Sequence, residues 1–330
     1  MLDVTRLRVL VAVARYGSVT AAARALNYAQ PSISHHIARL ESETGARLLE
    51  RAGRGVRLTE AGKLLAERAE EIIGRLDAAE AELAAHVGLR EGRVRLAAFP
   101  SALGTIVPAA AARLEAETPG MDLMLTEAEP PEALRMLRAG YVDVALVFQH
   151  YQQDVDASPP TAEDEGMRGR LILDEAVYLV TAARGQPAGH GGDLAAYAGH
   201  RWIAGCERCR GYLIRQCAIA GFTPKVAFTT DDYVAVQALV AAGLGVTTLP
   251  CLCLRAARHP GITTAALPGA RRHVFAMTYG DPPDPPATAR LISVLSEVAA
   301  GPDAGAAGEG PACSGSPSGT PAADLAASMS

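Results

Sequence analysis

The spacing of apolar residues changes at about residue 92 of this 330-residue chain, and the change separates two kinds of architecture. Before it, apolar residues recur at helical spacing, most clearly over residues 3–16 and 60–87. After it, apolar strands alternate with helical segments, beginning with a strand at 94–99 and a helix at 101–117. Because such alternation is typical of α/β folds, we expect a helical domain followed by an α/β domain with a parallel-rich sheet.

Residues 19–40 have the pattern of a helix-turn-helix, in which two short helices are joined by a tight connection. Ser18 can cap a helix over 19–26. The next helix begins at Gln30-Pro31, where the N–H that proline lacks would be unpaired in any case. Its buried face would consist of Ile33, Ile37 and Leu40. The rest of this helix is polar and therefore available to a partner.

A wing and a long helix follow. Residues 46–58 suggest two short strands around a Gly-Arg-Gly turn, and Thr59 is a suitable N-cap for a helix that runs to about residue 87. Apolar residues in this helix alternate four and three apart, which is the spacing of a helix-pairing seam. Packing of the helix on its own domain is the alternative. The seam residues that would join two copies are Leu65, Ile72, Leu76 and Leu83.

Charge is distributed unevenly along the chain. Residues 1–62 hold nine arginines against five acidic residues, a local balance of +4, whereas the whole chain carries −5. A basic N-terminal end is typical of a DNA-facing domain. No apolar run is as long as a membrane span, and the charged first twenty residues do not resemble a signal peptide. We therefore expect a cytoplasmic protein with no membrane contact and with reduced cysteines.

Four blocks of sequence resemble the LysR-type transcription regulators in order and spacing. They are Ala-Ala-Ala-Arg-Ala-Leu (21–26), Gln-Pro-Ser-Ile-Ser-His-His-Ile-Ala-Arg-Leu-Glu (30–41), Gly-Ala-Arg-Leu-Leu-Glu-Arg (45–51) and Val-Arg-Leu-Thr-Glu-Ala-Gly (56–62). The resemblance implies a winged helix-turn-helix over 1–62, a dimerising linker helix over 63–91 and an effector-binding domain over 92–300. That domain would have two α/β lobes, like the type 2 periplasmic binding proteins. The Gly-, Ala-, Ser- and Pro-rich residues 301–330 are expected to be a disordered tail.

The resemblance places the DNA contacts on the second helix and on the wing. In a helix-turn-helix, the first residues of the second helix reach base edges in the major groove. Glutamine can pair with adenine, and serine or a protonated histidine can reach guanine acceptors. Wing arginines would contact phosphate or the minor groove. The predicted residues are Gln30, Pro31, Ser32, Ser34, His35 and Arg39 on the helix, and Arg51, Arg54 and Arg57 on the wing.

The resemblance also implies an effector cleft between the two lobes. A helix that starts near Ser101 would direct free N–H groups into this cleft, which would favour an anionic effector. Each residue assigned to the cleft has a turn or cap role as its alternative. The predicted residues are Ser101, Ala102 and Leu103 on one side, Gly205, Cys206, Thr229 and Thr230 on the other, and Phe148 near the crossover.

Other functions fit the sequence less well. Cys206-Glu-Arg-Cys209 has the Cys-x-x-Cys spacing, but a structural zinc site needs about four ligands, so we expect no metal and no cofactor. Thiol-based redox sensing by this pair remains an alternative. The chain lacks the common catalytic motifs, so we expect no enzyme. A solute-binding protein would fit the second domain but would leave the basic first domain without a role.

The resemblance implies a homodimer or homotetramer that binds double-stranded DNA at an interrupted palindrome and acts on RNA polymerase. Closure of the lobes on a small molecule would change the spacing or angle of the paired DNA-binding domains. For this to happen, the effector must bind the two states with different affinity.

Overall fold

The computed structural model describes residues 2–52, 55–86, 92–152, 166–183 and 192–301. Arg54, residues 87–91 of the predicted linker and residues 302–330 of the predicted tail lie outside these described residues. The N-terminal elements are α1 (Val4–Tyr16), α2 (Val19–Ala25), α3 (Gln30–Thr44), β1 (Leu49–Ala52), β2 (Gly55–Leu58) and α4 (Glu60–His86). None of the helices in the described part of the chain is long and apolar enough to cross a membrane.

Local chemistry accounts for the boundaries of these helices. Ser18 accepts a hydrogen bond from the N–H of Ala21 at 3.4 Å, and Thr59 Oγ1 accepts one from the N–H of Gly62 at 3.0 Å. Both predicted caps are therefore confirmed. Between α2 and α3 the chain turns at Asn27, whose φ of 56° lies in the left-handed region that asparagine tolerates better than most residues. This turn sets α3 against α1 and α2 around one apolar core.

The α/β domain is built on a six-stranded sheet in the order β4-β3-β5-β10-β6-β9. Strands β3, β4 and β5 are parallel, whereas β10 is antiparallel to both β5 and β6. A separate parallel pair, β7 and β8, belongs to the second lobe. The strands are β3 (Arg93–Ala98), β4 (Asp122–Glu127), β5 (Val144–Gln152), β6 (Met167–Ala182), β7 (Arg201–Ala204), β8 (Lys225–Thr229), β9 (Thr247–Pro250) and β10 (Ile262–Tyr279).

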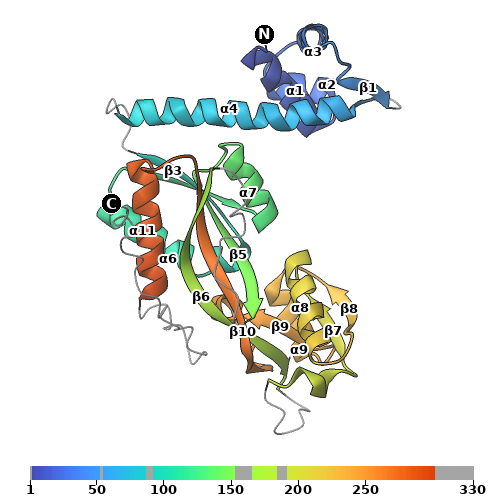
Figure 1. Ribbon diagram of the computed structural model, residues 1–330, viewed down its shortest axis with the longest axis vertical. Coiled ribbons are helices and arrows are strands. Elements are labelled where there is room, and N and C mark those ends of the chain that lie inside the picture. The colour runs from blue at the N-terminus through green and yellow to red at the C-terminus, as the bar shows by residue number, and fades with distance from the viewer. Residues whose placement is uncertain (1, 53–54, 87–91, 153–165, 184–191, 302–330) are drawn as a thin grey trace, which may run out of the picture.

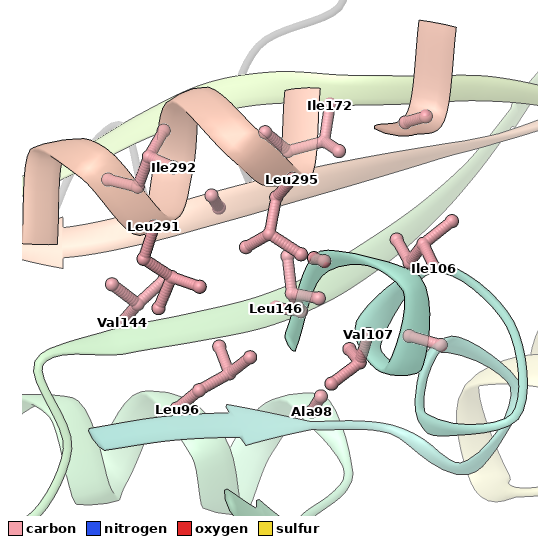
Figure 2. Packing of buried hydrophobic residues seen from close by; sticks show 14 of the residues in the cluster. Leu96, Ala98, Ile106, Val107, Val144, Leu146, Ile172, Leu291, Ile292 and Leu295 are labelled. Atoms are coloured by element: carbon pink, nitrogen blue, oxygen red, sulfur yellow. The ribbon is translucent and has the colours of Figure 1, made fainter. Parts of the chain in front are cut away.

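In the first lobe the sheet has helices on both faces. Alternate residues of β3 and β5 point to opposite sides, as strand geometry requires, so Leu96 and Leu146 face α6 (Ile106–Glu117) and α11 (Pro286–Ala300). Figure 2 shows these leucines interleaved with Leu291 and Leu295 of α11. Ala97 faces the other side, where α7 (Pro130–Arg138) packs. This lobe also includes the short helix α5 (Pro100–Leu103).

The second lobe carries the remaining elements. These are the 3-10 helix η1 (Leu194–Tyr197) and the helices α8 (Glu207–Ile219), α9 (Tyr233–Ala241) and α10 (Cys251–Ala256). Trp202 of β7 is fully buried in this lobe, in a cluster that includes residues of β6 and α8. Figure 1 shows β6 and β10 running the length of the domain, so the two lobes share long strands instead of being linked by loops.

Several elements differ from the sequence prediction. The helix predicted over 101–117 is two helices, because the backbone at Thr105 (φ −137°, ψ −86°) is not helical. The apolar pattern of the sequence predicts a strand only at residues 273–279, whereas β10 already begins at Ile262. Its Pro268-Gly269 interrupts the apolar pattern, and its pairing with β6 is irregular between Ala266 and Arg271. Helices α10 and α11 were not predicted.

Helix α4 crosses the first lobe with backbone against backbone, next to the end of α7 (Figure 1). A Cβ atom at Gly74 would lie 1.0 Å from the carbonyl oxygen of Ala139, and one at Gly140 would lie 2.3 Å from the carbonyl carbon of Gly74. Beside this crossing Arg75 donates a hydrogen bond to the hydroxyl of Tyr279, and its guanidinium lies 4.7 Å from the centre of that ring. Only glycine permits so close a crossing.

Candidate DNA-binding face and effector cavity

Helix α3 has a buried apolar face and an exposed polar face. Ile33, Ile37 and Leu40 are buried against α1 and α2, as predicted. On the opposite side Ser34 and His35 are exposed, together with Gln30, Pro31 and Arg39, while Ser32 is half-buried. Arg39 forms an ion pair with Glu43 at 3.5 Å. The polar side chains therefore lie on a surface that no other part of the described chain covers.

The wing is a two-stranded hairpin, in which Glu50 of β1 pairs with Arg57 of β2. Arg57 Nε donates to Glu50 Oε1 at 2.6 Å across the two strands. Arg51 is exposed and is not in an ion pair among the residues that the structure describes. The start of β1 is fixed by Glu41 of α3, whose Oε1 accepts the N–H of Leu48 at 2.8 Å. The wing is thus held at a defined place beside α3.

The seam predicted on α4 is divided between two surfaces. Ala66, Ala69 and Ile73 are buried in the core of the DNA-binding domain, and Leu65 packs against the same core. Leu65 therefore packs within its own protomer and does not belong to the exposed part of the seam. Ile72, Leu76 and Leu83 are instead 44%, 39% and 65% exposed, and they follow one another along α4 at heptad positions. This exposed part of the helix is an apolar strip without a partner in the described chain.

A cavity lies between the two lobes, with about 620 Å³ of space outside protein atoms, part of it open to solvent. The first lobe contributes residues at the ends of β3 and β4, the long strands β5, β6 and β10 form the floor, and the second lobe supplies the N-terminal ends of α8 and α9. Its lining includes Phe99, Ser101, Glu129, Phe148, His150, Gly205, Cys206, Cys209, Tyr212, Thr230, Asp231, Tyr233, Cys253 and Arg272. Its position matches the cleft expected between two α/β lobes.

A buried ion pair supports the floor of this cavity. Arg272 of β10 is 2% exposed, Glu175 of β6 is 0% exposed, and Arg272 Nε donates to Glu175 Oε1 at 2.6 Å. The other carboxylate oxygen accepts the N–H of Leu252 at 2.6 Å. Burial raises the pKa of Glu175, and the positive charge of Arg272 opposes this rise. The guanidinium also donates to Ser101 Oγ at 3.1 Å, so its charge is balanced by Glu175 and its Nε and Nη2 donors are engaged.

The acidic residues Glu129 and Asp231 line the opposite side. The Oε2 atom of Glu129 is buried and has no hydrogen-bond partner among the described residues. Burial raises the pKa of Glu129, and the nearby negative charge of Asp231 raises it further. Tyr212 is 3% exposed, and its hydroxyl is also without a described partner. Buried polar groups are nearly always paired in native proteins, so these two groups of the lining are available to hydrogen-bond with a molecule in the cavity.

Five of the eight predicted effector residues line the cavity, namely Ser101, Phe148, Gly205, Cys206 and Thr230. The other three lie outside its lining. Ala102 is fully buried in the core of the first lobe, Leu103 packs against the same core, and Thr229 is an exposed residue of β8 paired with Ala204. The residues that sequence reasoning missed include Glu129, Tyr212 and Arg272. The described residues contain no group of three or more His, Cys, Asp or Glu side chains arranged to hold a metal.

The fold and the two surfaces define a class of protein in which a helix-turn-helix domain is coupled to a two-lobed ligand-binding domain. Residues 4–63 match the family described as "Bacterial regulatory helix-turn-helix protein, lysR family", and residues 88–300 match the "LysR substrate binding domain". The chain therefore belongs to the LysR family. It is a transcription regulator with an N-terminal DNA-binding domain and a C-terminal effector-binding domain.

Individual relatives agree with this assignment. The chain is 29% identical over 252 residues to the "Probable HTH-type transcriptional regulator LrrA" of Synechococcus elongatus, covering 76% of this chain and 82% of that protein. Among solved structures, the LysR family regulator CbnR superposes with a TM-score of 0.63 at 24% identity, covering 90% and 99% of the two chains. Full-length CbnR in complex with its target DNA superposes with a TM-score of 0.62 at 24% identity, covering 90% and 100%.

Proposed function

We propose that this regulator reads DNA through the exposed face of α3 and is controlled by a small molecule bound in the cavity between the lobes. Control by a small molecule is supported by the carboxylate oxygen Oε2 of Glu129, which is buried in that cavity without a hydrogen-bond partner among the described residues. DNA recognition by α3 is supported by the separation of its buried apolar face from its exposed polar face. The domain division proposed from the sequence, 1–62, 63–91, 92–300 and 301–330, fits this scheme.

The charges around the cavity argue against an anionic effector. Helix α5 has only four residues, and the hydroxyl of Ser101 already accepts a hydrogen bond from Arg272. Arg272 is neutralised by Glu175, whereas Glu129 and Asp231 add negative charge to the lining. We therefore propose an effector that donates hydrogen bonds to Glu129 and presents an apolar side to Phe148.

A ligand panel tests this site. Small amines, amides, alcohols and carboxylates are each added to the full-length protein, and the melting temperature is recorded. A binder from the donor-bearing groups should raise the melting temperature, since a ligand at 100 times its Kd adds about 2.7 kcal/mol of stability. The Glu129→Gln variant should lose this shift for the same compound, while the exposed Glu115→Gln variant should keep it. Stabilisation by carboxylates alone, unaffected by Glu129→Gln, would contradict the proposed chemistry.

We further propose that two protomers pair through the exposed strip of α4. Burying an exposed leucine or isoleucine side chain contributes about 1.5–3 kcal/mol, so Ile72, Leu76 and Leu83 together favour a second copy of the same helix. Two paired α4 helices would carry two α3 helices to neighbouring half-sites on DNA. A tetramer made of two such dimers is compatible with this scheme.

The Leu76→Asp variant tests the pairing. It should shift the protein from dimer or tetramer to monomer at micromolar concentration, because a carboxylate in an apolar seam is desolvated without a partner. Light scattering after size-exclusion chromatography measures the mass. The Glu67→Ala variant alters an exposed position on the same helix and should leave the mass unchanged. If Leu76→Asp retains the wild-type mass, α4 is not the interface.

The remaining proposals concern the setting in which the protein acts. Binding to chromosomal DNA would place it in the cytoplasm, and its target would be transcription by RNA polymerase. We propose a non-enzymatic role, in which ligand binding changes the geometry of the two DNA-binding domains. Such a change requires the effector to have different affinities for the two arrangements.

A further inference from the structure

Two cysteine side chains meet at the start of helix α8. Cys206 is the N-cap of this 13-residue helix, and Cys209 lies in its first turn. Their sulfur atoms are 3.2 Å apart, with Cys206 Sγ and Cys209 Sγ in a thiol hydrogen bond. A disulfide bond has sulfur atoms about 2.0 Å apart, so a movement of little more than an ångström would close one.

The two thiols differ in acidity. The pKa of Cys206 is lowered, chiefly because the Cys209 thiol hydrogen-bonds to it, and the Cys209 N–H adds to the effect. The pKa of Cys209 is raised well above its usual value by its hydrogen bond to Cys206 and by burial. Glu129 and Asp231 oppose ionisation of Cys206, whereas Arg272 favours ionisation of Cys209 and the neighbouring Cys253 opposes it. The pair therefore has one thiol suited to attack and one that stays protonated.

Cys206 is also accessible to a small molecule. It lines the cavity between the lobes, and it lines an adjoining and more open cavity bounded by Arg208, Arg215 and Gln149. The free cysteine Cys217 is buried inside the second lobe at 0% exposure. A dissolved reagent would therefore reach Cys206 before Cys217.

We propose that Cys206 and Cys209 form a reversible dithiol–disulfide couple that exchanges with low-molecular-weight disulfides. The Cys206 thiolate attacks one sulfur of the small disulfide RSSR, a mixed disulfide forms on Cys206, and RS⁻ leaves. Cys209 loses its proton and attacks the Cys206 sulfur of the mixed disulfide, closing the Cys206–Cys209 bond and releasing a second RS⁻. The protein loses two electrons and two protons, and RSSR is reduced to two molecules of RSH. This covalent chemistry does not depend on DNA binding or on the effector.

The chain is convenient for a direct test, because Arg208 lies between the two cysteines. Reduced full-length protein is equilibrated in glutathione buffers from fully reduced to fully oxidised, quenched with acid, alkylated and digested with trypsin without reduction. Trypsin separates residues 202–208 from residues 209–210, so the disulfide appears as these two peptides held together. We expect this linked species to replace the alkylated peptides in a single transition as the share of oxidised glutathione rises.

Variants assign the role of each sulfur. Cys209→Ser should stop at the mixed disulfide, with one glutathione on Cys206. Cys206→Ser should slow the reaction of Cys209 with oxidised glutathione at least about tenfold. Cys217→Ser should titrate like the wild type. The proposal is overturned if the wild type gives no linked species in fully oxidised buffer, or if glutathione is found on Cys209 instead of Cys206. Because each readout is a covalent mass, misfolding of one variant does not obscure the wild-type result.

Discussion

A protein carrying both Ser34→Ala and His35→Ala should lose at least about tenfold in affinity for its specific DNA site. Each good side-chain contact with a base edge contributes about 1–3 kcal/mol of discrimination, and both residues lie on the exposed face of α3. Neither side chain belongs to the buried face formed by Ile33, Ile37 and Leu40, so folding should be unaffected. The site is selected from a random library with wild-type protein and then titrated with both proteins.

Arg51→Ala is the matched contrast for this double variant, because Arg51 lies on the wing and not on α3. A phosphate contact carries no sequence information, so this variant should weaken binding to every DNA about equally. It should also reduce the slope of log affinity against log salt by about 0.9. Wild-type affinity of the Ser34→Ala, His35→Ala protein for the selected site, with excess competitor present, would mean that α3 is not the recognition helix.

Replacement of Arg272 by methionine should lower the free energy of unfolding by about 3–5 kcal/mol at pH 7.5. The loss is large because Glu175, at 0% exposure, would remain as a buried charge without its partner. Urea unfolding followed by the fluorescence of Trp202, the only tryptophan, reports on the effector-binding domain. Arg93→Met is the control. Arg93 and Asp122 form an ion pair with exposed side chains, which should contribute about 0–1 kcal/mol.

The loss in Arg272→Met should shrink as the pH falls. Burial raises the pKa of Glu175, and without Arg272 only the N–H of Leu252 and the more distant charge of Arg255 oppose that rise. The folded state then binds a proton at a pH where the unfolded state does not, so stability increases as the pH falls towards the unfolded pKa. Replacing Glu175 by Gln as well should recover part of the stability. The guanidinium of Arg272 also lies 5.0 Å and 4.7 Å from the ring centres of Phe99 and Phe148. A loss that is independent of pH and unchanged by the second substitution would mean that this packing dominates.

The helix-turn-helix was predictable because its signals are local. Caps at Ser18 and Thr59 and the spacing of Ile33, Ile37 and Leu40 each lie within one or two turns of helix, and the structure confirms them. The long strand β10 could not be delimited in the same way. Its two halves belong to different lobes, and Pro268-Gly269 lies between them. The local sequence pattern therefore indicates that the strand ends there. In the structure β10 continues, and its pairing with β6 resumes after an irregularity.

The cavity was only partly predictable, because its key groups are paired through strand register. Asp174 and Glu175 of β6 lie opposite His273 and Arg272 of β10, and successive side chains of a strand point to opposite faces. Arg272 and Glu175 therefore point inward together. The sequence did offer a signal, since one apolar strand holds two adjacent acidic residues and another holds two adjacent arginines. However, Arg272 and Glu175 are 97 residues apart, so a local pattern cannot show that they pair.

Where Gly74 crosses Gly140, α4 rests directly on the effector-binding domain, so any rotation at this contact moves the whole N-terminal part of α4. From Gly74 to the start of α4 at Glu60 is about 21 Å at 1.5 Å per residue, and the DNA-binding domain is packed on that part of the helix. A turn of about 5° at the contact would displace the start of α4 by about 2 Å. Because backbone touches backbone there, no flexible side chain absorbs the turn. A small rotation of the first lobe is thereby passed to the DNA-binding domain.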